Sequence, residues 1–97
     1  MPVTVIALVT VCDDCPAELA AYFQVTGPLL QRAGARIIKR FEINEVIVGH
    51  RPARSVIIVE FPNRAAVDQV FDSPEYESII PIRDLAFLNY QISIVGD

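Results

Sequence analysis

The chain has little of what metal-binding, disulfide-stabilised or nucleic-acid-binding proteins require. Its 97 residues include one histidine and two cysteines, so the usual four-ligand zinc set is incomplete and we expect no metal. Two cysteines cannot form a disulfide framework. The eight Lys and Arg residues never form a run, and the net charge is −4. We therefore expect no nucleic-acid partner.

The marks of a secretion signal are also missing. Residues 1–11 are apolar, but they have neither the basic segment nor the small-residue cleavage site of a signal peptide. The run is too short to span a bilayer. We interpret it as a buried strand, and we expect a cytoplasmic protein without a membrane partner.

Hydrophobic residues, in contrast, are abundant. They make up 53% of the chain, and the mean hydropathy is +0.40. A single small domain cannot usually hide so much apolar surface. No composition shift or repeat divides the chain, so we expect one domain over residues 1–97 whose remaining apolar surface is covered by a partner.

Four segments have the apolar, β-branched composition of strands. They span residues 3–11, 35–42, 55–61 and 88–95. Residues 45–48 either extend the second strand or begin a hairpin that turns through residues 49–52. The first and third segments are apolar on both faces, which is typical of strands covered on both sides.

A long helix is expected between the first two strands. It begins at Pro16, where an aspartate or Cys15 can cap it, and Gly34 is a natural stop. Apolar residues recur at three- and four-residue steps along it and form one buried stripe. Gly27-Pro28 should kink this helix, because proline removes a backbone donor.

A second helix is expected after the third strand. Asn63 is a good N-cap for it, and residues 66, 67, 70 and 71 form its buried stripe. Ser73-Pro74 then starts a short helical turn through residues 76–80, which Pro81 is expected to interrupt.

The resulting βαββαβ order predicts an α+β, ferredoxin-like sandwich. Right-handed crossovers give it a four-stranded antiparallel sheet with the helices on one face. The other face is apolar too and needs a cover of similar shape. A second copy of the chain is the simplest partner, and about 800 Å² per subunit would make a stable homodimer.

Several motifs in this order resemble the DUF1330 family of the dimeric α/β-barrel, ferredoxin-like superfamily. They are Gly34-Ala35-Arg36, Arg40, Val59-Glu60-Phe61-Pro62, Ser73-Pro74-Glu75-Tyr76 and Arg83. The resemblance covers nearly the whole chain and implies a homodimer closed into an α/β barrel. Proteins of this barrel type include cofactor-independent monooxygenases, lactone isomerases and haem enzymes, with pockets between sheet and helices. For this chain we expect no cofactor.

Two candidate catalytic residues stand out. His50 is the only histidine, and it is either a general base or a solvated residue of the hairpin turn. Glu60 interrupts an apolar strand, where a carboxylate is costly unless paired. It is either a partner of Arg36 or Arg40 across the sheet or dimer, or a pocket carboxylate with a raised pKa.

The candidate ligand-binding residues are Arg40, Tyr76 and Arg83. Tyr76 and Arg83 flank Pro81, where they either bind a small anionic ligand or tie an irregular segment to the sheet. Cys12 and Cys15 resemble a redox CxxC motif, but the order of elements differs from that of a thioredoxin fold and the aspartates between them raise the thiol pKa.

These residues favour a homodimeric small-molecule-binding protein or a minor metabolic enzyme, with its pocket between sheet and helices. The alternative is a non-catalytic dimeric structural or interaction module. Whether the chain is an enzyme stays open, because fold analogy does not assign a reaction.

Overall fold

Seven elements follow one another in the computed structural model, which describes residues 1–96. They are β1 (Val3–Val11), α1 (Pro16–Arg32), β2 (Arg36–Glu42), β3 (Ser55–Phe61), α2 (Arg64–Phe71), α3 (Pro74–Ala86) and β4 (Phe87–Val95). The predicted order is confirmed, with α2 and α3 together occupying the place of the second helix.

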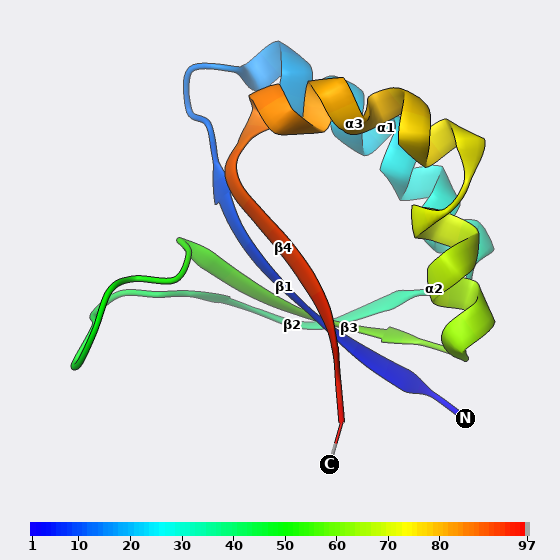
Figure 1. Cartoon of the computed structure of the whole chain (residues 1–97), viewed down its shortest axis with the longest axis horizontal. Coiled ribbons are helices and arrows are strands. Elements are labelled where there is room, and N and C mark those ends of the chain that lie inside the picture. The colour runs from blue at the N-terminus through cyan, green and yellow to red at the C-terminus, as the bar shows by residue number, and fades with distance from the viewer. Residues whose placement is uncertain (97) are drawn as a thin grey trace.

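The strands form one antiparallel sheet in the order β2-β3-β1-β4. The two most continuously apolar segments, β1 and β3, therefore occupy the centre. All three helices lie on one side of the sheet, and the β2–β3 hairpin extends beyond them (Figure 1). The ferredoxin-like, α+β prediction is thus confirmed.

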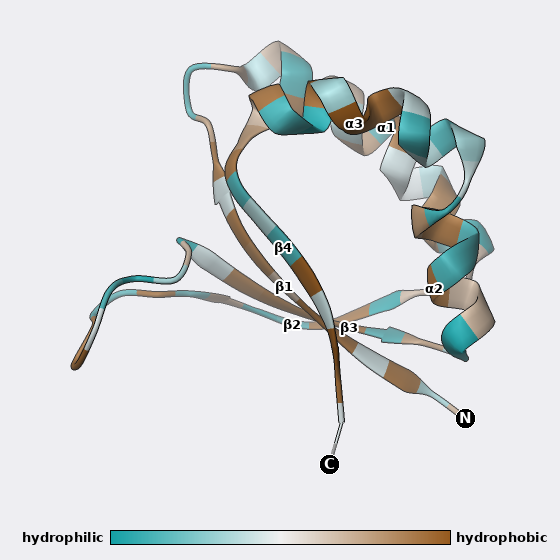
Figure 2. Ribbon diagram, viewed as in Figure 1, coloured by the Kyte–Doolittle hydropathy of each residue, from teal (hydrophilic) through white to brown (hydrophobic). Residues whose placement is uncertain are grey.

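Alternate residues of each strand face opposite sides of the sheet. In β1, Val5, Ala7 and Val9 face the helices and are at most 7% exposed, whereas Ile6 and Leu8 on the other face are only partly buried. The inward residues pack against buried residues of all three helices in one hydrophobic core. Hydrophobic residues recur along β1 and at the tip of the β2–β3 loop (Figure 2). The helices thus cover only one of the two apolar faces of the sheet.

The helix N-termini are capped unequally. The Ala66 backbone N–H donates to the Asn63 side chain at 2.8 Å, as expected for α2, and the Tyr76 N–H donates to Ser73 Oγ at 3.1 Å at the start of α3. Cys15 occupies the N-cap position of α1 without a side-chain hydrogen bond. Pro16 at the first position already lacks one of the N–H groups that a cap would satisfy.

The expected break at Pro81 is wrong. α3 runs through Pro81 for 13 residues, and β4 begins one residue earlier than expected, at Phe87. Both Pro81 and Glu77, whose carbonyl loses its helical partner, are exposed, so water can hydrate that carbonyl at little cost. Arg83 therefore lies on a regular helix and not on irregular backbone.

Residues 45–48 do not extend the second strand. β2 ends at Glu42, and residues 43–54 form a loop that contains Val46, Ile47 and Val48 in exposed positions. A strand there would have no neighbour, because β3 begins only at Ser55. Across the described part of the chain, no helix combines the length and apolarity needed to cross a membrane.

Replacing Gly34 with alanine is expected to destabilise the fold by about 1–2 kcal/mol, because Gly34 has φ +77° and this left-handed conformation is costly for other residues. A Cβ there would also lie 3.3 Å from Pro62 Cγ. The control is Gly27→Ala within α1, where a Cβ meets nothing within 4 Å; it should stabilise by about 0.5–1 kcal/mol. Urea unfolding of both variants checks the opposite signs, and equal effects would contradict the argument.

Candidate functional site

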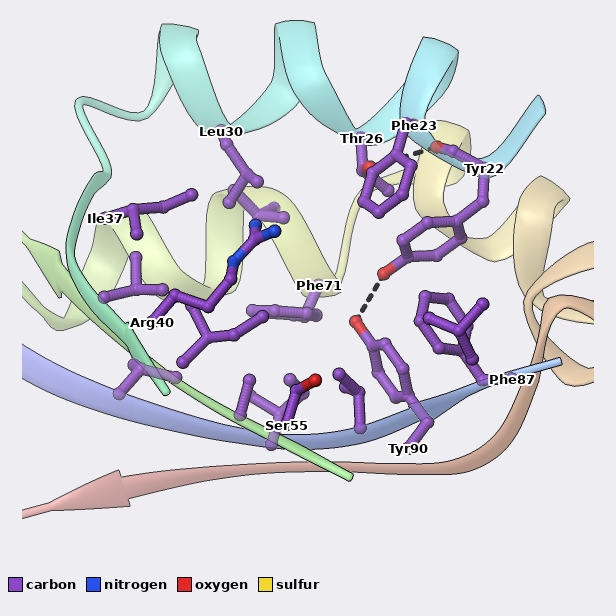
Figure 3. Close-up of a pocket in the computed structure, with 18 of the residues that line it drawn as sticks. Tyr22, Phe23, Thr26, Leu30, Ile37, Arg40, Ser55, Phe71, Phe87 and Tyr90 are labelled. Carbon is purple, nitrogen blue, oxygen red and sulfur yellow. Dashed lines mark hydrogen bonds between the residues drawn. The ribbon is translucent and has the colours of Figure 1, made fainter. Parts of the chain in front are cut away.

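A pocket of about 270 Å³ lies between the sheet and the helices. Its floor is made by inward-facing residues of all four strands, and its roof by residues of α1, α2 and α3 (Figure 3). The lining is mostly apolar, and the volume lies near the lower end of the range for small-ligand pockets. Its few polar side chains therefore decide what it can bind.

Three tyrosines from distant parts of the sequence meet at one end of this pocket. Tyr22 comes from α1, Tyr76 from α3 and Tyr90 from β4. The Tyr76 hydroxyl lies 3.0 Å from that of Tyr90 and 3.3 Å from that of Tyr22. The Tyr22 and Tyr90 hydroxyls are hydrogen-bonded as well, as the dashed line in Figure 3 shows. We call Tyr22, Tyr76 and Tyr90 the tyrosine cluster.

Two hydroxyls of the tyrosine cluster, those of Tyr22 and Tyr90, have raised pKa values. Burial raises the pKa of the Tyr22 hydroxyl above its ordinary value, and the neighbouring Tyr90 and Tyr76 raise it further. Burial also raises the pKa of Tyr90, although its hydrogen bond to Tyr22 and, less strongly, the nearby Arg83 guanidinium act in the opposite direction. Both hydroxyls therefore stay protonated to a higher pH than an ordinary tyrosine does.

Arg83 joins the tyrosine cluster from outside the pocket. Its Nη1 donates to the Tyr76 hydroxyl at 3.4 Å, and its guanidinium carbon lies 5.1 Å from the centre of the Tyr90 ring, within cation–π range. Burial lowers the pKa of Arg83, but its bonds to Tyr76 and to the Asp84 carboxylate, 3.2 Å away, outweigh this and raise it. Since Asp84 supplies a carboxylate partner, the ligand-binding role of Arg83 stays a prediction.

Arg40 lines the pocket from the opposite edge of the sheet. Arg40 on β2 pairs with Ile57 on β3. The same row of the sheet continues through Ala7 on β1 to Ile92 on β4. Three strand spacings separate these edges, or about 14 Å. The side chain points from β2 into the cavity, toward the side occupied by Leu30 (Figure 3). The side chain of Arg40 makes no hydrogen bond or ion pair with any residue from 1 to 96.

Glu60 and His50 lie away from the pocket. Glu60 pairs with Arg36, whose Nη2 donates to Glu60 Oε1 at 2.8 Å, on the sheet face that the helices leave uncovered. His50 is exposed in the loop of residues 43–54. The structure thus brings Arg40 and Tyr76 into one pocket, with Arg83 behind Tyr76, and places the two candidate catalytic residues elsewhere.

Cys12 and Cys15 form a second local cluster, with their sulfurs 3.2 Å apart and both thiols free. The hydrogen bond from Cys12 raises the pKa of Cys15 to about 11, and burial, Glu18 and Asp14 add to it. A protonated thiol is a poor nucleophile. This arrangement favours the interpretation that the pair is not a redox centre.

Tyr22 and Tyr90 were not among the candidate site residues. Their positions fit a buried stripe and a strand, so the sequence alone suggests only packing. The signal they do carry is the hydroxyl group, because a buried tyrosine usually finds a polar partner. For Tyr22 this polar partner is Tyr90, which lies 68 residues further along the chain.

The fold and the pocket between its layers define the chain as a ferredoxin-like α+β protein. It belongs to the DUF1330 family, described as a domain of unknown function, whose model matches residues 3–96. No curated protein matches the chain.

Solved structures of similar fold have low sequence identity. The RPA0582 protein of unknown function from Rhodopseudomonas palustris has a TM-score of 0.79 and 21% identity, covering 99% of this chain and 82% of its own. SnoaB, a cofactor-independent oxygenase from Streptomyces nogalater, has a TM-score of 0.62 and 16% identity, covering 99% and 92%. A dimeric protein of unknown function and ferredoxin-like fold from Bacteroides fragilis has a TM-score of 0.56 and 17% identity, covering 99% and 96%. These similarities show the fold.

Proposed function

We propose that the protein is a homodimer that binds a small, largely apolar molecule carrying an anionic group. The observation that carries the proposal is the Arg40 guanidinium, which faces an apolar pocket without a protein partner. Five other arginines have a carboxylate within 3.5 Å. Arg40 is therefore free to bind an anion from outside the chain, and a guanidinium grips carboxylates at two points.

The tyrosine cluster supplies the second recognition element. Its three hydroxyls bond to one another at the end of the pocket opposite to Arg40, and their remaining lone pairs can accept hydrogen bonds from a ligand. A pocket with apolar walls and a few convergent polar groups is the usual form of a small-molecule site. The candidate ligand-binding residues Arg40 and Tyr76 both contribute to it, and Arg83 supports Tyr76.

The size and shape of the isolated chain support the dimer. A compact monomer of 10.8 kDa has an accessible surface of about 5,500 Å², whereas this chain has 6416 Å². The excess of about 900 Å² is close to the ~800 Å² that each partner buries in a stable interface. The chain is also flat, measuring 36 × 36 × 16 Å, as expected for one layer of a thicker assembly.

The uncovered sheet face is the surface that a second copy would bury. Its centre consists of Ile6 and Leu8 of β1 beside Ile58 and Val56 of β3, all partly exposed in the single chain. The ferredoxin-like neighbour from Bacteroides fragilis is described as dimeric, which supports the pairing of two copies. In such a dimer, Glu60 and Arg36 would lie at the interface. A catalytic role of Glu60 or His50 stays a prediction that requires a site outside the pocket.

One preparation of the protein tests both parts of the proposal. We expect light scattering to give twice the chain mass of 10.8 kDa. Native mass spectrometry of protein purified from cells, followed by denaturation and metabolite analysis, should recover a small anion from the wild type and less of it from Arg40→Gln. The matched control is Arg51→Gln, an arginine of the loop that does not line this pocket. Equal recovery from all three proteins would contradict the binding site, and a folded monomer would contradict the dimer.

A further inference from the structure

We propose that the ligand is a small aromatic acid, with an oxygen-substituted ring held at the tyrosine cluster and a short carboxylate-bearing chain that reaches Arg40. The inference rests on the proposed function and adds the chemical class of the ligand. Three features of the pocket carry it: the aromatic wall at one end, the hydroxyl groups set into that wall, and the aliphatic floor that separates them from Arg40.

The aromatic residues of the chain are concentrated in this pocket. All Phe and Tyr residues except Phe41 line it. Neighbouring rings meet edge to face: Tyr22 and Phe87 have centroids 5.1 Å apart, as do Phe71 and Tyr76, with interplanar angles of 79° and 71°. Because aromatic rings gain energy from such packing beyond simple burial, a flat aromatic ligand extends this array better than an aliphatic chain does.

The oxygen on the ligand ring follows from the hydroxyls in this wall. Three tyrosine hydroxyls hold three protons but six acceptor lone pairs, and the Arg83 guanidinium adds another donor at Tyr76. The three mutual bonds use all three protons, so a phenol on the ligand can donate to one of the lone pairs that remain free. A bare hydrocarbon ring would cover these polar groups without replacing their hydrogen bonds to water, which costs free energy.

The carboxylate belongs at the other end. Between Tyr90 on β4 and Arg40 on β2, the pocket floor is formed by Val9, Ala7 and Ile57 of the two central strands. Ser55 also lines this part of the pocket, but its hydroxyl already donates to Glu42 Oε2 at 3.0 Å. The rest of the floor is aliphatic, which favours an apolar segment of the ligand above it. The unpaired guanidinium of Arg40 then meets the acid group at the edge of the sheet.

Four related probes test the three features separately by calorimetry with the purified dimer. They are 4-hydroxycinnamate, cinnamate without the phenol, 4-hydroxycinnamide without the charge, and octanoate without the ring. We expect 4-hydroxycinnamate to bind most tightly. Removing the charge from the ligand, with the amide, or from the protein, with Arg40→Gln, should weaken binding about tenfold or more. Arg51→Gln should leave every affinity unchanged.

The variant Tyr90→Phe tests the hydroxyl contact without emptying the wall. In the wild type we expect 4-hydroxycinnamate to bind about fivefold more tightly than cinnamate, and in Tyr90→Phe that difference should largely vanish. If octanoate binds as tightly as 4-hydroxycinnamate and Arg40→Gln weakens its binding, the ligand is not of the aromatic class. The proposed anion site at Arg40 would then still be supported. If no probe binds the folded protein at about 1 mM, the aromatic class fails, and metabolite recovery then decides the proposed function independently.

Discussion

The variant Ile58→Glu is expected to convert the dimer into a folded monomer. Ile58 lies at the centre of the uncovered sheet face, paired with Ile6 on β1 and beside Lys39 on β2. In the isolated chain a carboxylate at this position is hydrated. In a dimer it would be buried in an apolar interface, which costs several kcal/mol. The dissociation constant should therefore rise by about a hundredfold or more.

The control for this prediction is Leu85→Glu. Leu85 is 60% exposed on α3, on the helical side of the molecule, so the same new charge lies outside the proposed interface. We expect Leu85→Glu to remain dimeric and Ile58→Glu to become monomeric in light scattering over a range of concentrations. Circular dichroism should show that both are folded. A dimeric Ile58→Glu protein would show that the second copy does not cover this face.

Local signals in the sequence were enough to predict most of the fold. The apolar segments that became β1 and β3 indicate central strands, and Asn63 correctly predicts the start of α2. Pro81 misled the prediction, because the cost of a proline within a helix depends on whether the carbonyl left unpaired can reach water. This depends on which side of α3 faces solvent, which the sequence does not state directly.

The candidate site was predictable only in part. Arg40 and Tyr76 were expected as ligand-binding residues, and both line the pocket; their role stays a prediction. Glu60 attracts attention because it interrupts an apolar strand, yet alternation places it on the face opposite to the pocket. The tyrosine cluster depends on contacts between α1, α3 and β4, and long-range contacts of this kind leave no local pattern.

The tyrosine cluster should also make the protein unusually sensitive to alkali. The pKa values of Tyr22 and Tyr90 are raised in the folded state above the ordinary value of 10.0. The unfolded chain therefore loses these two protons first as the pH rises through 10, so it binds fewer protons than the folded chain. Stability from this source is full below pH 10 and falls above it, by about 1.4 kcal/mol per pH unit for each tyrosine.

The test compares the parent protein with the double variant Tyr22→Phe/Tyr90→Phe in urea unfolding between pH 9 and pH 11. The pKa of Cys15 is also raised, from 9.0 to about 11, so this thiol makes the folded protein lose stability in the same pH range. Both proteins should therefore carry Cys15→Ser. The double variant keeps the aromatic rings and leaves the Tyr76 hydroxyl bonded to Arg83, so it should fold. Above pH 10 we expect its stability to fall less steeply than that of the parent, by up to about 2.7 kcal/mol per pH unit. Parallel curves would show that the two hydroxyls ionise as readily in the folded protein as in the unfolded chain, and the tyrosine cluster would then add no sensitivity to alkali.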